Sequence, residues 1–542
     1  MRRLWLSLAM LATGVGLLVS AELAGASGTK YGGIFRVGST GASVQVDPQI
    51  GYITTAWWLE YATAAKLYNW KDGGNTLVPE VASSFGISNH GRTYTFTIRR
   101  GFRFSDGSPV TARNFAYAID RVANHDLGSP GAQFITDPNG TDIVGALAVN
   151  GGDAKHVSGV VVKSRRLIIR LVKADPSFLF KLTMPFFQAT STALPLTHEV
   201  TGSYPSAGPY FYSHNDVNVE TSIRRNPFWT RGPGRTRPRN LTGLDIHWNL
   251  NQQAIFDEVQ ANQLDEDADL PPDLIQSVAN EYGVNRTRFW VKPQNCIGFL
   301  LFNTANPLFH KNVPLRKAIN WAVDRTDYAA PAGPYAGSPW THLLPPGFPG
   351  SISAKRLQPY SPRANIPRAK KLAAGHFRSG KIVVLGRPYG VINPNQASLI
   401  RRDLIRLGFK PQNVTMKWMY CDISCIPPAD WDISASTGWC ADTSDPHDFF
   451  FPFLHDLWDP TKPGGLDSSA YGKKLRAASK LVGNARLRAF GKLDLEITEN
   501  LAPAAPMRTY NNRYFFSNRV DPSSLRYSGA YQDWDIPALA LK

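Results

Sequence analysis

"LVPEVASSFGISNHGRTYTFTIRRGFRFSDGSPVTARNFAYAIDRV", residues 77–122, carries the clearest structural pattern in the chain. Apolar residues alternate with polar ones, as in a strand with one buried face, at Tyr94, Phe96 and Ile98. The turn "SDGSP" follows, and Thr111 can cap a helix whose apolar residues recur on one side. The stretch therefore predicts strands plus a helix, which is an α/β unit rather than a pure sandwich.

Strand and helix patterns continue to alternate outward from this stretch. A further strand is expected at "RRLIIRLV" (165–172), and the apolar run "NCIGFLLFNT" (295–304) is typical of a central strand buried on both faces. Later elements are expected as helix 313–325, a helix near 363–375, strand 381–386, helix 395–408 and strand 414–418. This alternation predicts a mostly parallel sheet in the second half.

The bulk composition bounds the architecture and the partners. A chain of 542 residues exceeds what one hydrophobic core usually supports, so two or three domains are expected. Apolar residues make up 43% of it, which is enough for a folded protein. Lys and Arg outnumber Asp and Glu by 59 to 42, a net charge of +17 that favours attraction to anionic surfaces.

The N-terminus predicts export. Two arginines precede an apolar run over about residues 4–21, and "AGA" (24–26) offers the small residues that a signal peptidase reads. We therefore expect a signal peptide over residues 1–26 and a periplasmic or extracellular protein, with an uncleaved anchor as the alternative. No cysteine near the junction supports a lipoprotein anchor, and export argues against a nucleic-acid partner.

Two charged segments are interpreted as solvent-facing. The acidic stretch 252–276 predicts two helices broken at Pro271 and Pro272, with its acids on a solvated helix face. It lacks the spacing of a calcium-binding hand. The six arginines of "RRNPFWTRGPGRTRPR" (224–239) are interpreted as a solvated loop.

Enzyme signatures are missing from the sequence. It has no GxSxG and no HExxH, the marks of common exported hydrolases. "GHFRSGK" (375–381) matches a phosphate-binding loop only up to its lysine, and a strand follows where that loop needs a helix. We therefore expect no enzyme and no cofactor.

The four cysteines fit an oxidising compartment. Cys296, Cys421, Cys425 and Cys440 form no CxxC motif, so zinc is disfavoured and disulfides are expected. Three pairings are open to four cysteines.

The stretch "GWCADTSDPHDFF" (438–450) combines a cysteine, a histidine and three aspartates. Its mixed hard and soft donors make a poor metal site, and nothing in it supports a catalytic Cys–His pair. A pocket wall explains it better, because Trp439 offers an apolar or cation-binding face and Asp442 a carboxylate for an ammonium group. Turn and helix-start roles are expected for Asp445, His447 and Asp448.

The chain resembles the extracellular solute-binding proteins of peptide and nickel ABC importers, the group of the dipeptide and oligopeptide binders. The resemblance runs over effectively the whole mature chain, in matching order. It is carried by residues 77–122 and by "SAGPYFY" with "RRNPFW" (206–229), "FNTANPLFHKNVPLRKAINWAVDR" (302–325), "LPPGFPG" (344–350) and "DISASTGWCADTSDP" (432–446).

This resemblance implies an α/β, bilobed, class II periplasmic-binding-protein-like fold with an additional inserted α/β domain. Lobe I would comprise residues 27–68, 200–295 and 513–542. The inserted domain would span 69–199 and lobe II 296–512.

The resemblance also implies site residues. Asp442 in "WCAD" would hold a peptide's α-ammonium beside Trp439, and a Cys296–Cys440 disulfide would close a loop of over a hundred residues. By looser alignment Tyr52, Asp269 and Leu270 would face the cleft. The sequence departs from the oligopeptide binders at "SASTG" (434–438), which lacks their basic residue.

The function implied is that of the substrate-binding subunit of an ABC importer. Such a protein captures a peptide between two lobes and delivers it to a membrane permease, and we expect a monomer. The alternatives are another solute such as a sugar, an opine, nickel or a metal chelate, an exported hydrolase, or a basic adhesion protein.

Overall fold

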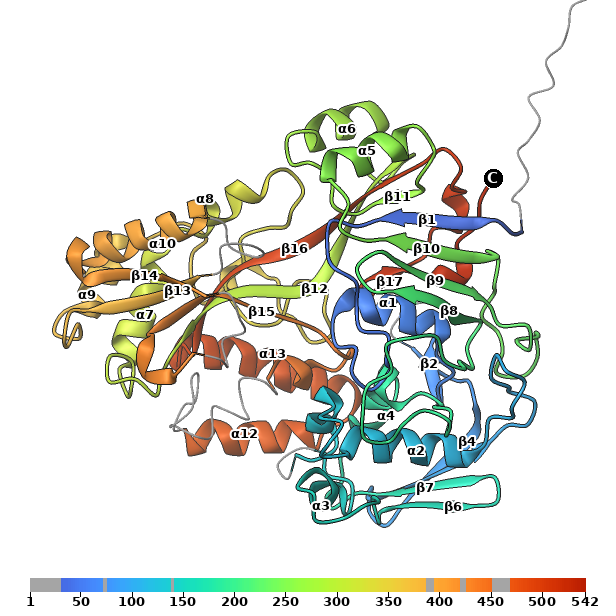
Figure 1. Ribbon diagram of the computed structural model, residues 1–542. Helices are drawn as coiled ribbons and strands as arrows, with labels where there is room; N and C mark the ends of the chain where they lie inside the picture. Colours follow the sequence, from blue (N-terminus) through green and yellow to red (C-terminus); the bar gives the residue numbers. More distant parts are fainter. Residues whose placement is uncertain (1–30, 72–75, 138–140, 387–393, 420–425, 451–467) are drawn as a thin grey trace, which may run out of the picture.

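The computed structural model describes residues 31–71, 76–137, 141–386, 394–419, 426–450 and 468–542. The expected signal peptide and two of the cysteines, Cys421 and Cys425, lie outside these residues. The molecule has two lobes joined by two long strands, β12 (Phe289–Phe302) and β16 (Ala504–Phe516), which cross from one lobe to the other (Figure 1). Both belong to one ten-stranded sheet, ordered β14-β13-β15-β12-β16-β11-β1-β10-β9-β8. This fold is bilobed and mixed α/β.

Lobe I contains the second half of that sheet. Its strands are β1 (Ile34–Gly38), β8 (Tyr210–Asp216), β9 (Glu220–Arg225), β10 (Gly243–His247) and β11 (Glu266–Asp267). Its helices are α1 (Thr54–Thr63), α5 (Gln252–Gln260) and α6 (Ile275–Tyr282). Short strands β17 (Tyr527–Ser528) and β18 (Asp533–Trp534) close the C-terminal segment.

A separate four-stranded sheet, ordered β4-β5-β7-β6, lies next to lobe I. It is built from β4 (Ala82–Ser88), β5 (Thr93–Ile98), β6 (Val160–Lys163) and β7 (Arg166–Arg170), and a small pair, β2 (Tyr68–Trp70) and β3 (Leu77–Pro79), precedes it. Its helices are α2 (Ala112–Ala123), α3 (Ala146–Asn150) and α4 (Phe178–Lys181).

The pattern of residues 77–122 is confirmed in this sheet. Tyr94, Phe96 and Ile98 are buried on one face of β5, and their neighbours are half-exposed. Helix α2 begins directly after Thr111, whose backbone N–H and hydroxyl both donate to Asn114 Oδ1, at 2.8 and 2.9 Å. The cap and the alternation together fix this unit as the sequence predicts.

Lobe II packs helices on both faces of its half of the long sheet (Figure 1). Its strands β13 (Ile382–Gly386), β14 (Val414–Trp418) and β15 (Ile433–Cys440) join β12 and β16. One hydrophobic core is shared by helices α7 (Val313–Ala322), α9 (Ile366–Ala373) and α10 (Pro394–Leu407). A second core is shared by α12 (Ser469–Ser479) and α13 (Gly483–Asn500). The short helix α8 (Arg325–Ala329) follows α7. The expected helices and strands of this half are confirmed.

Strand β12 is buried on both faces, as its apolar run predicts. Leu300 and Phe302 pack into the core with α7 and α10, whereas Ile297 and Phe299 pack into the core with α13. Because side chains alternate along a strand, one continuous apolar run supplies both cores.

The expectation of a mostly parallel sheet in this half is wrong. Strands β13 and β14 are parallel, and so are β13 and β15, but β12 is antiparallel to both β15 and β16. The chain enters lobe II along β12 and returns to lobe I along β16, so these two neighbours must run in opposite directions. Two connections between lobes therefore impose the antiparallel centre.

The interpretation of residues 252–276 is wrong in part. Helix α5 ends at Gln260, and the following acids enter β11, between β1 and β16, instead of a solvated helix face. Asp265 accepts hydrogen bonds from the backbone N–H of Arg36, at 3.0 Å, and from the Ser517 hydroxyl, at 2.8 Å. These acids are buried because β11 is hydrogen-bonded between β1 and β16 inside the sheet.

The six arginines of residues 224–239 are also not a solvated loop. Five of them donate to nearby acceptors and hold the segment together: Arg224 to Asp245, Arg225 to the Leu241 carbonyl, Arg235 to the Thr230 carbonyl, Arg237 to Glu80 and Arg239 to the Asn226 carbonyl. The side chain of Arg231 is exposed and makes no hydrogen bond or ion pair with any described residue. In this irregular segment, guanidinium groups donate to backbone carbonyls that no regular helix or strand would satisfy.

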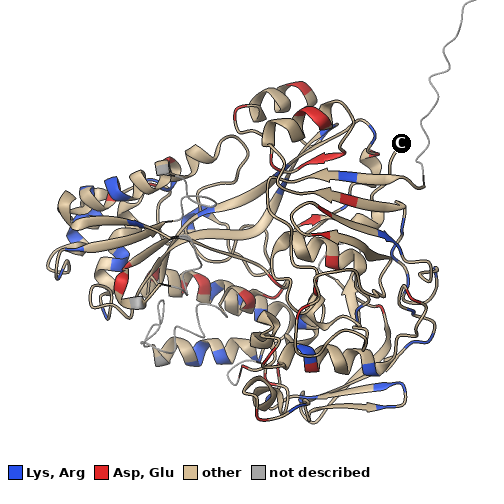
Figure 2. Ribbon diagram, viewed as in Figure 1, with Lys and Arg blue, Asp and Glu red and all other residues tan. Residues whose placement is uncertain are grey.

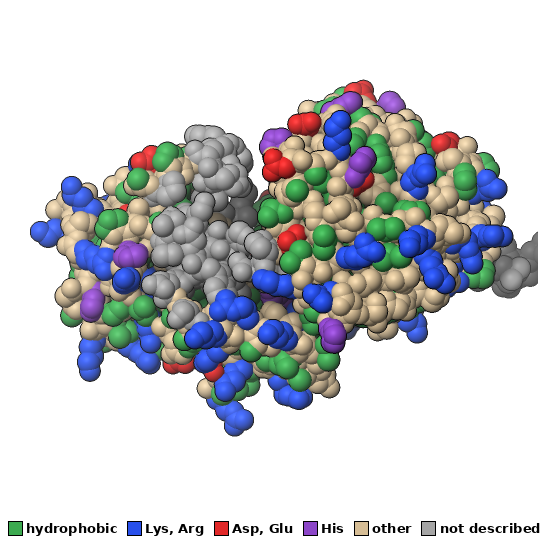
Figure 3. Space-filling view, turned by 90° about the horizontal axis from the view of Figure 1, so that it is seen from below, with side chains coloured by type: hydrophobic (Ala, Val, Ile, Leu, Met, Phe, Trp, Pro, Cys, Tyr) green, Lys and Arg blue, Asp and Glu red, His purple; other side chains and the backbone are tan. Residues whose placement is uncertain are grey.

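Positive charge is spread widely over the molecule. Lys and Arg lie on the outer helices of lobe II and on the β6–β7 hairpin (Figure 2). The face seen in Figure 3 carries Lys and Arg over both lobes with few acids among them. In the part of the chain that the structure describes, no helix is both long and apolar enough to span a bilayer.

Candidate functional site

Strand β15 positions the site at the point where lobe II meets lobe I. It pairs with β12 so that Cys440 lies opposite Cys296, and the two are joined by a disulfide across 144 residues of sequence. The structure thus contains the bridge that the family resemblance implies. Immediately after it, the Ala441 N–H donates to the Asn295 carbonyl at 2.9 Å and the Ala441 carbonyl accepts from Gln532 at 3.1 Å. The disulfide and these bonds fix the point from which Asp442 projects.

Asp448 organises the loop that carries Asp442. Its Oδ2 accepts from the backbone N–H of Asp442, at 2.6 Å, and of Thr443, at 3.1 Å. The short 3₁₀ helix Pro446–Phe449 brings this carboxyl back toward the end of β15. The sequence predicted only a turn or helix-start role for Asp448, because nothing in the spacing shows that the chain folds back on itself.

The Asp442 carboxyl is buried and accepts a hydrogen bond from the opposite lobe. Tyr52, which precedes α1, donates its hydroxyl to Asp442 Oδ2 at 2.8 Å. Burial raises the pKa of Asp442 to about 7, against the lowering effect of the Tyr52 hydroxyl. Burial, followed by the charge of Asp442, also raises the pKa of Asp448 well above its usual value. Two carboxyls near each other in a desolvated place resist ionisation, so the site favours a cation.

An aromatic cluster holds Tyr52 in place. Its ring lies 5.8 Å from that of Trp57, 6.1 Å from Phe134 and 5.5 Å from Phe186, all centroid to centroid. Phe134 and Phe186 come from the segment next to the four-stranded sheet, so three parts of the chain meet at this tyrosine. Its hydroxyl is directed to Asp442 by packing that leaves the ring little freedom.

The same loop is fastened within lobe II by a buried ion pair. Asp445 accepts from Arg486 Nε and Nη2, both at 2.8 Å, and its Oδ1 also accepts from the His447 backbone N–H at 2.9 Å. The helix-start role expected for Asp445 is thereby confirmed, and the arginine 41 residues away is the part that the sequence did not show. A bidentate arginine pair fixes a carboxylate in both position and orientation.

The loop contacts the segment that carries the four-stranded sheet. A small cavity between them, with room for about one water molecule, is lined by residues of both sides, including His447 and Lys181. Burial lowers the pKa of His447 to about 4, with the nearby positive charge of Lys181 acting in the same direction. His447 is therefore neutral at pH 7 and is no cationic partner for Asp442.

Trp439 lies next to the disulfide on β15. It pairs with Ile297 across the sheet, is half-buried against the core of α13, and its indole N–H is buried without a hydrogen-bond partner among the described residues. Tyr52 and Asp442 are thus joined by a hydrogen bond, whereas Trp439 lies three residues before Asp442, near the end of β15. An indole donor without a partner is available to an acceptor on a bound molecule.

Asp269 and Leu270 lie elsewhere in lobe I. Asp269 is exposed and accepts from the Thr40 hydroxyl at 2.8 Å, whereas Leu270 is buried in the core between α5 and α6. Within the described residues, neither has a contact with Asp442 or Trp439. The looser alignment therefore names two residues that the structure does not bring to the site.

Metal binding has no support at this site. No group of three or more His, Cys, Asp or Glu residues in the described ranges is arranged to hold a metal ion. Cys440 is committed to its disulfide and His447 faces Lys181 across the small cavity. The arrangement offers instead two buried carboxyls, Asp442 and Asp448, next to the aromatic cluster around Tyr52.

A bilobed α/β fold with a desolvated recognition site between its lobes is the architecture of a solute-binding protein. The model of "Bacterial extracellular solute-binding proteins, family 5 Middle" matches residues 76–460. The chain belongs to this family, whose binding proteins are periplasmic or extracellular.

Curated relatives have several different ligands in their names. Di/tripeptide-binding protein 1 of Pseudomonas aeruginosa is 22% identical over 82% of each chain, and the periplasmic oligopeptide-binding protein OppA of Escherichia coli is 24% identical over 69% of each. The probable deoxycholate-binding periplasmic protein YgiS of Escherichia coli is 25% identical over 57% of each. The chain spans a little over half the length of this relative and, at 58%, of dipeptide-binding protein DppE of Bacillus subtilis.

Solved structures share the fold over nearly the whole length. The clavulanic acid biosynthesis oligopeptide binding protein 2 has a TM-score of 0.78 at 20% identity, covering 94% of this chain and 96% of that one. Listeria monocytogenes OppA bound to peptide has a TM-score of 0.72 at 16% identity, covering 94% and 99%. These homologues are binding proteins, not enzymes.

Proposed function

We propose that this protein is the substrate-binding subunit of an ABC importer that captures peptides between its lobes and delivers them to a membrane permease. We further propose that it acts as an exported monomer, without cofactor and without enzymatic activity. Family membership supports the transport role, and the relatives named for dipeptides, tripeptides and oligopeptides support the ligand class.

The single observation that carries the proposal is that Asp442 is buried without a cationic partner among the described residues. Its carboxyl is buried, its pKa is raised to about 7, and the partner that the structure gives it is a neutral phenol. A carboxyl in this state gains most from a ligand cation, because ionisation beside an ammonium group removes the penalty of an isolated buried charge. The α-ammonium of a peptide supplies that cation, and Trp439 lies beside it as an apolar wall.

Closure of the two lobes follows from the positions of Tyr52 and Asp442 in different lobes. Tyr52 belongs to the segment 27–68 assigned to lobe I, and Asp442 belongs to lobe II (296–512), with the inserted domain over 69–199. A ligand amine at Asp442 would face both lobes at once, so its binding energy favours the closed arrangement. This division into domains is part of the proposal.

The site discriminates between the ligand classes seen among the relatives. A bile acid such as deoxycholate is an anion, so it brings no positive charge to favour the ionisation of the buried carboxyls at 442 and 448. A peptide brings its own positive charge to the same corner. The lack of a basic residue in 434–438 means that a peptide's carboxyl end is not neutralised from that segment, and water-filled space can take varied residues there.

Calorimetry with a small peptide set tests the proposal. Each peptide is titrated with a free and with an N-acetylated amino end into protein freed of any bound ligand. We expect free peptides to bind at one per chain and acetylation to weaken them by about 2 kcal/mol or more. Equal binding of both forms would remove Asp442 from the ammonium role.

A further inference from the structure

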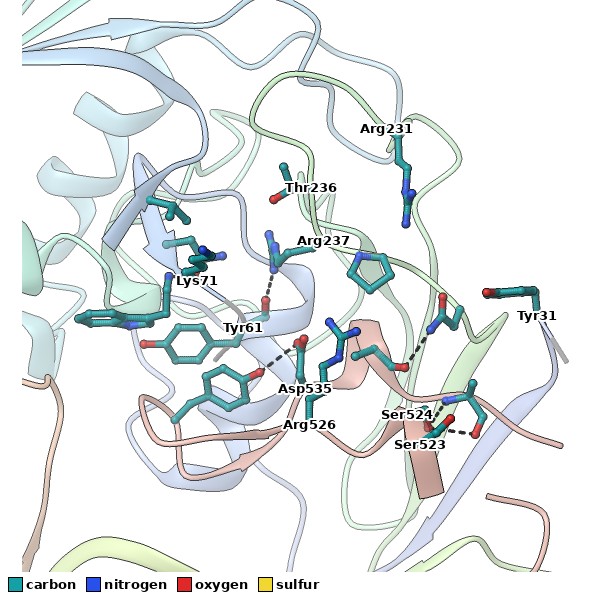
Figure 4. A pocket seen from close by; sticks show the side chains of 18 of the residues that line it. Tyr31, Tyr61, Lys71, Arg231, Thr236, Arg237, Ser523, Ser524, Arg526 and Asp535 are labelled. Carbon is teal, nitrogen blue, oxygen red and sulfur yellow. Dashed lines mark hydrogen bonds between the residues drawn. The ribbon is translucent and has the colours of Figure 1, made fainter. Parts of the chain in front are cut away.

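A second pocket lies in lobe I and shares no lining residue with the site around Asp442. It has a volume of about 650 Å³, within the range of small-molecule sites. Three segments far apart in the sequence supply most of its lining, namely the β2–β3 region, the loop of residues 231–240 and the C-terminal segment 521–540 (Figure 4). Tyr31 and Tyr61, the latter from α1, complete it. The function proposed above uses none of these residues.

Three cations without a partner among the described residues line this pocket. Lys71, Arg231 and Arg526 come from the three different segments, and each side chain is exposed. None of the three makes a side-chain hydrogen bond or ion pair with another residue of the described ranges. Figure 4 shows the guanidinium groups of Arg231 and Arg526 directed into the space that the segments enclose. Like charges lining one cavity repel one another, which an anion between them would relieve.

The wall behind these cations is rigid. Arg237 donates Nε to Glu80 Oε1 at 2.8 Å and further bonds to the carbonyls of Tyr61 and Ala64, so it is fixed in place and its charge is neutralised. The ring of Tyr61 stacks on that of Tyr531 at 4.4 Å between centroids, which gives the pocket a flat aromatic surface. A preformed wall lowers the entropic cost of binding.

The two carboxylates that line the pocket are held within the protein. Asp521 Oδ1 accepts from the backbone N–H and the hydroxyl of Ser523, at 2.9 and 2.8 Å. Asp535 Oδ1 accepts from the Tyr531 hydroxyl at 3.0 Å. Leaving out Arg237, which is paired with Glu80, three cationic side chains line the pocket against these two acids, so the balance stays positive.

We propose that this pocket is a second ligand site that binds a phosphate-bearing group. Arginine forks match phosphate oxygens in pairs, and Lys71 adds a point charge. A phosphate dianion suits a pocket lined by three unpaired cations better than a carboxylate does, because it offers more charge and more acceptor oxygens. The aromatic surface of Tyr61 and Tyr531 accommodates an apolar or ring-bearing part of the same ligand.

Two sources can supply such a group, and they share this chemistry. One is free phosphate or a small phosphorylated compound in solution. The other is the headgroup of an anionic phospholipid, which would bring lobe I to a membrane surface.

The test uses the full-length protein and two double variants of equal charge. Arg231→Ala with Arg526→Ala removes both guanidinium groups from the pocket. Lys163→Ala with Arg166→Ala removes two exposed cations from the β6–β7 hairpin, where Figure 2 shows positive charge away from this pocket. Inorganic phosphate is titrated by calorimetry, and sedimentation measures binding to vesicles of phosphatidylglycerol against phosphatidylcholine.

We expect the pocket variant to weaken binding about tenfold or more and the hairpin variant to leave it within about twofold. Saturable phosphate binding with this dependence identifies a small phosphorylated ligand, and dependence seen only with phosphatidylglycerol identifies a headgroup. Equal weakening by both variants would mean diffuse attraction to a chain of net charge +17 and would overturn the proposal, as would no binding in either arm. Peptide binding by the pocket variant serves as its folding control and also keeps this outcome separate from the peptide proposal.

Discussion

Asp442→Asn should strengthen the folded, ligand-free protein while abolishing its preference for a free amino end. The asparagine keeps an oxygen that can accept the Tyr52 hydroxyl, which lies 2.8 Å from the carboxyl in the native chain. It removes the charge that burial disfavours and the repulsion between Asp442 and Asp448. One substitution therefore has opposite effects on stability and on recognition.

The magnitude follows from the pKa of Asp442, about 7 in the folded chain against the ordinary 3.8. Below pH about 4 the carboxyl is protonated in both the folded and the unfolded chain, so ionisation favours neither. As the pH rises from about 4 to about 7, the unfolded chain ionises first and the folded chain loses stability. The difference corresponds to up to about 4 kcal/mol at pH 8, which the asparagine variant should recover.

Urea unfolding of ligand-free protein at pH 4 and at pH 8 measures this effect. We expect Asp442→Asn to match the native chain at pH 4 and to exceed it at pH 8. Asp445→Asn is the matched control, because it removes a buried carboxylate that is paired with Arg486, and its stability should fall. A loss of stability at pH 8 in the Asp442 variant would refute the view that burial of this carboxyl destabilises the folded chain.

The other predictions concern the contacts around the site. Tyr52→Phe removes a donor that lowers the pKa of Asp442, so carbon-13 NMR titration should find this pKa above about 7, and an unchanged value would show that the phenol is not bonded to it. Arg486→Ala should lower the unfolding free energy by about 3–5 kcal/mol, with a double cycle against Asp445→Asn showing strong coupling rather than simple addition. Reducing the disulfide that joins Cys440 to its partner 144 residues away should lower the unfolding free energy by roughly 5 kcal/mol at 25 °C, and a change under 1 kcal/mol would contradict the loop-entropy argument.

The local elements could be predicted from the sequence because their periodicity is strong. Tyr94, Phe96 and Ile98 alternate clearly, and α2 begins at the expected cap. The direction of β12 relative to β15 and β16 could not be predicted in this way. Strand pairing depends on how the chain crosses between lobes, and no short-range pattern records that path.

The candidate site residues came from the family motif, and spacing alone did not supply them. The resemblance gave Asp442 and Tyr52, which the structure joins by a hydrogen bond, Trp439, which packs against the core of α13, and Leu270, which is buried in another core. Asp448 was missed as a functional neighbour because its role arises from a loop that turns back on itself. Long-range partners are invisible to spacing, since hydrogen bonds form between residues that only the fold makes adjacent.

The acids of residues 265–267 also show that the fold overrides a local sequence pattern. A run of charges normally predicts a solvent-exposed face, but β11 needs backbone partners on both sides and takes these residues into the sheet. Burial raises the pKa of Asp267 to about 7 there. Backbone pairing within the sheet overrides the preference of these acidic side chains for solvent.

Mass spectrometry of whatever leaves the protein on gentle unfolding tests the central claim most directly. The protein is purified from a cell extract without exposure to added ligands, and its released contents are identified and counted against the chain. The account predicts peptides with free amino ends, at about one per chain, that disappear from Asp442→Asn. Recovery of an anionic steroid, a haem or another ligand without an amine, retained by both the native chain and the variant, would contradict it.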